Sequence, residues 1–130
     1  MYTDSLKSGY AVPARESATK RYCQVLELVD DPEKIAQYRK WHETENIWKE
    51  IPEGLRRIGV VDMEIYISGN MLFMIVETVA DFDWDEAFSL LATLPRQAEW
   101  EDMVGVFQKS APGARSDEKW RLMERMFKLP

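Results

Sequence analysis

The chain has very few groups that titrate near neutral pH: its 130 residues include one histidine, His42, and one cysteine, Cys23. A lone cysteine excludes an internal disulfide, so nothing points to an oxidising compartment, and we expect a cytoplasmic protein. A zinc or copper site would have to combine these two residues with carboxylates, and no such pair has a familiar ligand spacing. We therefore expect no bound metal ion.

Glycine-rich loops, long apolar runs and clustered positive charge are also missing. The six glycines are scattered singly, which argues against a phosphate-binding loop and a nucleotide cofactor. No apolar run has the length of a membrane span, and the opening MYTDSLKSGYAVPARESATK lacks the apolar centre of a secretory signal. A net charge of -6 argues against nucleic acid or an anionic membrane surface as a partner.

The composition that remains is that of one globular domain. A length of 130 residues suffices for one core and is too short for two, and 45% hydrophobic with 31% charged residues is ordinary for a folded protein. The polar residues 1–20 predict a flexible N-terminal arm. Residues 21–130 then form the single domain.

The first half of the domain predicts a strand followed by two helices. Residues 21–29 alternate roughly between apolar and polar side chains, which favours a strand. Asp31 followed by Pro32 is a typical helix start, and Pro52 is expected to interrupt the helical region before a second piece that Gly59 ends. The first helix should carry an aromatic face made of Ile35, Tyr38, Trp41, His42 and Trp48.

Residues 60–79 carry the clearest pattern, two strand-like runs joined by Gly69 and Asn70, which suit a hairpin turn. This turn predicts the cross-strand pairs Ile67 with Leu72, Ile65 with Met74, Met63 with Val76, Tyr66 with Phe73, and Glu64 with Ile75. The wholly apolar run 71–76 predicts a central strand buried on both faces. The face with Glu64, Tyr66, Phe73, Ile75 and Glu77 is mixed and suits a dimer contact or a wet cavity.

The last third predicts helices at residues 84–94 and 96–109, separated by Pro95, and then a final strand within residues 119–129, whose charges also permit a helix. The element order is that of the ferredoxin-like fold, an α+β fold with a four-stranded antiparallel sheet and helices on one face. Its other face needs cover, and a homodimer formed through this face supplies it.

Four segments in this order, YRKWH, EIYISGNMLFMIVE, QAEWEDM and MFKLP, resemble the L-rhamnose mutarotase family over residues 21–130. The resemblance implies a dimeric α/β barrel of ferredoxin-like chains that interconverts the α and β anomers of a 6-deoxyhexose without a cofactor. The substrate would be a monosaccharide. The segments PGARSDEKW and MEIY look more like members associated with L-fucose than with L-rhamnose.

The resemblance also implies site residues. His42 matches the family's proton-donating histidine, and Tyr38 matches the tyrosine one helical turn before it. Met63 stands where the family has a strand tyrosine, and Tyr66 matches a second tyrosine of that strand. The family's pair of tryptophans corresponds to Glu99 and Trp100.

Each assignment has an ordinary structural alternative. His42 and Tyr38 can be helix residues that only pack, Trp100 can be part of the core, and Tyr66 can belong to a dimer interface. The carboxylates Glu43, Glu45, Glu101 and Asp102 are most simply a solvated helix surface, although one could serve as a second proton carrier. Ferredoxin-like dimers also include ligand-binding modules and cofactor-free oxygenases, so the fold alone does not decide the function.

Overall fold

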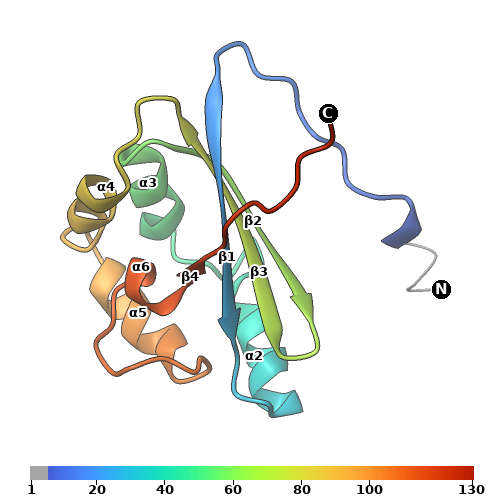
Figure 1. The fold of residues 1–130 in the computed structure, drawn as a ribbon. Helices are drawn as coiled ribbons and strands as arrows, with labels where there is room; N and C mark the ends of the chain where they lie inside the picture. The colour runs from blue at the N-terminus through green and yellow to red at the C-terminus, as the bar shows by residue number, and fades with distance from the viewer. Residues whose placement is uncertain (1–5) are drawn as a thin grey trace.

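The computed structural model describes residues 6–130, which form a four-stranded antiparallel sheet in the order β2-β3-β1-β4 with helices on one face (Figure 1). In chain order the elements are β1 (Thr19–Glu27), α2 (Pro32–Trp41), α3 (Glu50–Arg57), β2 (Val60–Ser68), β3 (Met71–Val79), α4 (Trp84–Leu91), α5 (Gln97–Gly105), α6 (Ser116–Lys119) and β4 (Arg121–Leu122). The predicted ferredoxin-like α+β fold is confirmed. None of the helices in residues 6–130 is long and apolar enough to cross a membrane.

Helix α2 starts as the sequence predicts. The Asp31 side chain accepts hydrogen bonds from the backbone N–H groups of Glu33 and Lys34, and Pro32 takes the first helical position, where no N–H is needed. The helix ends at Trp41, so His42 is its C-cap and Trp48 lies beyond it. The predicted aromatic face is therefore divided between α2 and the segment that leads to α3.

The hairpin of β2 and β3 has the predicted register. Every predicted pair is present, from Met63 with Val76 to Ile67 with Leu72. Gly69 has a φ of 59°, a left-handed conformation that glycine adopts without steric cost. The register places the aliphatic side chains of β2 and β3 under the helices and leaves Tyr66 and Phe73 on the open face.

Two predictions, one for strand β3 and one for Pro52, are wrong. Strand β3 is central, but it is not buried on both faces: Leu72, Met74 and Val76 are buried against the helices, whereas Phe73 keeps 36% of its surface exposed on the other side. Pro52 does not interrupt a helix. It lies in the first turn of α3, where a missing N–H costs no intrahelical hydrogen bond.

The end of the chain also differs from the prediction. Residues 116–119 form the short helix α6, and β4 pairs with β1 at only two positions, Gln24 with Leu122 and Val25 with Arg121. The remaining residues, 123–130, have no regular structure. Figure 1 shows α3, α4, α5 and α6 on one side of the sheet and residues 123–130 on the other.

The predicted N-terminal arm contacts the open sheet face through its described part, residues 6–18. The Arg15 guanidinium donates to both carboxylate oxygens of Glu77 at 2.9 Å and to Asp62 at 3.3 Å. The rings of Tyr10 and Tyr66 meet edge to face with centroids 5.5 Å apart. The arm therefore covers the β2 side of this face. Its first five residues lie outside the described part of the chain.

Candidate functional site

Helix α2 places His42 and Tyr38 one turn apart at the edge of the core. The Nδ1 atom of His42 lies 2.7 Å from the backbone carbonyl oxygen of Tyr38. A carbonyl oxygen only accepts, so Nδ1 must carry the hydrogen, and in the neutral imidazole Nε2 holds the free lone pair. The cap geometry of the helix thus fixes the tautomer of the histidine.

Burial sets the charge of His42. Loss of solvent lowers the pKa of the imidazole, and the hydrogen bond to the Tyr38 carbonyl opposes this effect only in part. The histidine is therefore neutral at pH 7. Its Nε2 atom is ready to accept a proton.

Aromatic rings surround the imidazole on two sides. The Tyr38 ring lies against it with centroids 4.3 Å apart, and Trp100 of α5 meets it edge to face at 5.4 Å. Trp48 packs on the far side of Trp100 at 5.3 Å. Because Tyr38 and Trp100 are 4% and 5% exposed, these contacts hold the histidine in one place.

His42 lines two adjoining hollows. One is an inner cavity of about 80 Å³ between α2, β2, β3 and α5, and the other is a wider depression of about 410 Å³, a volume typical of small-molecule sites. Both are lined by Tyr38, His42, Ile47, Met63 and Ile65. We call the inner hollow the His42 cavity.

Two buried amide groups in the His42 cavity lack a donor for their oxygen atoms. Gln97 and Gln108 are 4% and 6% exposed, and neither Oε1 atom has a hydrogen-bond partner within residues 6–130. Their Nε2 groups are engaged: Gln97 donates to Glu101 at 2.6 Å, and Gln108 donates to the Tyr38 hydroxyl at 3.2 Å. Because unsatisfied buried acceptors are costly, this wall favours a ligand rich in hydroxyl groups.

Glu101 also lines the cavity, contrary to its interpretation as solvated surface. Its side chain is 11% exposed, and its Oε1 atom lies 3.0 Å from the Nζ atom of Lys119, a side chain that is 2% exposed. Burial raises the pKa of Glu101, while Lys119 and Gln97 partly oppose the rise. Sequence analysis missed this because the spacing of Gln97 and Glu101, one helical turn, reads equally well as a polar helix face.

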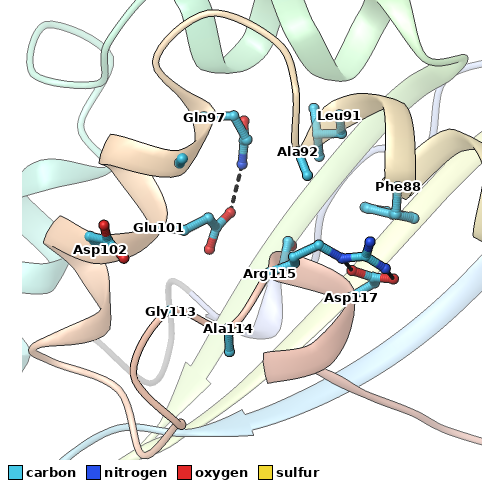
Figure 2. A pocket seen from close by; sticks show the side chains of 12 residues that line it. Phe88, Leu91, Ala92, Gln97, Glu101, Asp102, Gly113, Ala114, Arg115 and Asp117 are labelled. Atoms are coloured by element: carbon cyan, nitrogen blue, oxygen red, sulfur yellow. Dashed lines mark hydrogen bonds and ion pairs between the residues drawn. The ribbon is translucent and has the colours of Figure 1, made fainter.

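A second cavity of about 230 Å³ lies on the other side of Glu101, between α4, α5 and the segment 113–117. Figure 2 shows Gln97 and Glu101 on one side of this space and the paired side chains of Arg115 and Asp117 on the other. The second cavity and the His42 cavity share Leu91, Gln97, Glu101 and Ser116 as lining residues. Glu101 therefore borders both spaces.

The structure brings together four of the six residues predicted for the site: His42, Tyr38, Met63 and Trp100. It does not bring the other two to the same cavity. Tyr66 points to the open sheet face, where its hydroxyl donates to Glu64 at 3.3 Å. The Glu99 side chain is 66% exposed and lies 3.6 Å from Arg96.

Comparison with known sequences finds one matching family and two relatives. The sequence profile described as L-rhamnose mutarotase matches residues 21–129. The chain is 38% identical over 110 residues to an L-fucose mutarotase of Xanthomonas campestris pv. campestris, a match that covers 85% of this chain and 88% of the relative. A UPF0734 protein of Dictyostelium discoideum is also 38% identical, with 85% and 90% covered.

Two solved structures share the fold. The L-rhamnose mutarotase of Formosa agariphila superposes with a TM-score of 0.64 at 19% identity, covering 85% of this chain and 99% of that one. The tetracenomycin F2 cyclase of Streptomyces glaucescens superposes with a TM-score of 0.50 at 19% identity, with the same coverage. At this level of identity the superpositions describe the fold alone.

Proposed function

The chain belongs to the L-rhamnose mutarotase family, and from this premise we propose that it interconverts the α and β anomers of a 6-deoxyhexose with His42 as an acid–base group. It is thus an isomerase. The observation that carries the assignment of the site is the His42 cavity, where a half-buried imidazole with a fixed tautomer shares its lining with two amide oxygens that lack donors.

The reaction needs only proton transfer and positioning. Opening the ring removes the proton from the anomeric hydroxyl and adds one to the ring oxygen, and closing the ring from the other face of the anomeric carbon gives the second anomer. The free Nε2 atom of His42 is suited to accept or return one of these protons. No cofactor takes part in the proposed reaction.

The walls of the cavity fit the two sides of a deoxy sugar. The Oε1 atoms of Gln97 and Gln108 can accept hydrogen bonds from sugar hydroxyl groups, which would satisfy both amides. Ile47, Met63 and Ile65 form an apolar wall that can hold the methyl group of a 6-deoxyhexose. Trp100 offers an aromatic surface beside the histidine.

We propose L-fucose as the first substrate to test and L-rhamnose as the second. The relative at 38% identity is named an L-fucose mutarotase, and the segments PGARSDEKW and MEIY favour the same choice. We also propose that the protein acts in the cytoplasm, since its single cysteine gives no sign of an oxidising compartment.

Saturation-transfer NMR on free sugars tests this function. With L-fucose, we expect the protein to raise the rate of anomer exchange well above the spontaneous rate. With L-galactose, which differs from L-fucose only by a hydroxyl on C6, the increase should be roughly 10- to 100-fold smaller, because the apolar wall offers that hydroxyl no partner. An exchange rate at the spontaneous value for L-fucose and L-rhamnose alike would refute the proposed function.

We further propose a homodimer formed through the open face of the sheet. Phe73, Ile75, Cys23 and Val25 lie on the part of that face that the arm does not contact. Light scattering should give twice the 15.2 kDa mass of one chain at micromolar concentration. Phe73→Lys should shift the protein toward monomer, and Leu90→Lys, an exposed position on α4, should not. A monomeric wild-type protein contradicts the proposal.

A further inference from the structure

We propose that Glu101 is the second proton carrier of the reaction, acting on the sugar oxygen that His42 does not serve. This inference rests on the proposed mutarotation and adds a residue to its mechanism. Its basis is that Glu101 and His42 line the same cavity, to which α5 also contributes Trp100. The sequence had suggested a second carrier without identifying it.

The chemistry requires two exchange points for protons. When the bond between the anomeric carbon and the ring oxygen breaks, the anomeric hydroxyl loses a proton as its carbonyl forms, and the ring oxygen gains one. Ring closure reverses both transfers, so the proton count of the enzyme is unchanged after each turnover. The Nδ1–H of His42 is held by the Tyr38 carbonyl, which leaves Nε2 as the one atom through which this ring can exchange protons.

Elimination among the lining residues leads to Glu101. Of the residues that line the His42 cavity, the ionisable ones are Tyr38, His42 and Glu101. Burial raises the pKa of Tyr38 and outweighs the opposing hydrogen bond that its hydroxyl accepts from Gln108, so this phenol holds its proton too tightly to pass it on. Arg39 lines the wider depression, but a guanidinium stays protonated and cannot act as a carrier.

The surroundings of Glu101 hold it in place and leave part of it free. Its Oε1 atom faces Lys119 and its Oε2 atom accepts from Gln97. The other charged or ionisable groups near it are Asp102, Asp117, Tyr38 and Arg115. A carboxylate has about four lone-pair sites, so two remain for a sugar hydroxyl. Burial raises the pKa of this carboxyl and lowers that of His42, which brings their proton affinities closer together.

Glu101 also borders a second space that His42 does not line. The second cavity, which Glu101 borders, includes the exposed residues Asp102 and Gly113 in its lining (Figure 2). A carrier that touches both spaces can return to its resting protonation state between turnovers. Burial disfavours the charge of this carboxylate, and the ion pair with Lys119 offsets that cost.

The pH dependence of exchange provides the test. If both groups carry protons, the active form holds one proton between them, so the wild-type rate with L-fucose should follow a bell-shaped curve that falls at low and at high pH. Glu101→Gln should lower the exchange rate by ~100-fold and remove one limb of the curve. Titration calorimetry should give an L-fucose Kd within about threefold of the wild-type value, because the amide keeps an acceptor for the sugar.

Two further variants complete the design. Asp102→Asn removes a neighbouring exposed carboxylate and should keep the wild-type rate and curve. Glu101→Gln/Lys119→Met removes both charges of the buried ion pair. It should show the same slow exchange and the same loss of one limb of the pH curve as Glu101→Gln. This variant serves as the test if Glu101→Gln alone fails to fold.

The inference is overturned if the variants without Glu101 keep the bell-shaped curve. It is also overturned if they lose sugar affinity by the same factor as rate, which would make Glu101 a hydroxyl-binding residue. A wild-type protein without exchange activity would instead refute the proposed function.

Discussion

Replacing His42 with alanine should slow the exchange of L-fucose anomers by ~100-fold or more, because positioned acid–base groups contribute roughly two to four orders of magnitude to a rate. The loss follows from the geometry: Nε2 is the free ring nitrogen, and Tyr38 and Trp100 hold the ring against the cavity. Exchange must be compared above the spontaneous rate, since free sugars equilibrate slowly in water.

Tyr38→Phe is the matched comparison for this variant. It removes a hydroxyl that bonds to Gln108 and leaves the ring that packs on His42, so its effect on exchange should be smaller than that of His42→Ala. Circular dichroism and thermal unfolding should show both variants folded. If His42→Ala keeps full exchange activity with an unchanged spectrum, the histidine only fills space at the end of α2.

Removing Lys119 should produce the largest loss of stability among the charged residues that we have described. Lys119→Met leaves the Glu101 side chain, which is 11% exposed, without the cation that pairs with it. Breaking a buried ion pair on one side costs roughly 3–5 kcal/mol. The carboxyl can escape part of this cost by taking a proton, and that makes the loss depend on pH.

The sign of the pH dependence follows from linkage. Without Lys119, burial raises the pKa of Glu101 in the folded state above the unfolded value of about 4.3, so the folded state binds the extra proton and loses stability as the pH rises. The loss therefore grows with pH above that value, by at most roughly 1.36 kcal/mol per pH unit. The variant should therefore be closer to the wild type at pH 5.

Urea unfolding of three variants at pH 7 and pH 5 checks this prediction. Lys119→Met should show the pH-dependent loss, and Glu101→Gln/Lys119→Met should regain most of it, since no buried charge remains. Lys109→Met removes the exposed partner of Glu27, a pair 2.7 Å apart, and should leave the stability almost unchanged at both pH values. Equal losses for Lys119→Met at both pH values would show that the pair contributes only packing.

The sequence predicted those parts of the fold that local patterns determine. Asp31 and Pro32 fix the start of α2, and Gly69 with the alternating residues on either side fixes the hairpin register, because a shift by one residue would expose the aliphatic face. It predicted a last strand within residues 119–129 but not how short β4 is. Where the last residues leave the sheet depends on two pairs with β1, and no local pattern marks their end.

The site likewise includes residues whose positions the sequence predicts and residues whose positions it does not. Tyr38 and His42 lie four residues apart on one helix, so their proximity follows from helical geometry. Closeness along the chain was misleading for Tyr66. It lies three residues after Met63, and alternate residues of β2 point to opposite faces of the sheet, so the two side chains lie on different faces. Glu101 was beyond sequence reasoning, because its burial depends on Lys119 from α6, a helix that no pattern predicted.

The segment 110–115 lines one side of the second cavity, and its sequence and length can vary during evolution. It lies outside the helices and strands, and it supplies Gly113, Ala114 and Arg115 to that cavity without contributing to the His42 cavity. Surface loops accept insertions and substitutions more readily than the elements that they connect. Related enzymes can therefore diverge in this loop, altering how the outer space meets Glu101, while the helix that carries the histidine and the sheet beneath it stay the same.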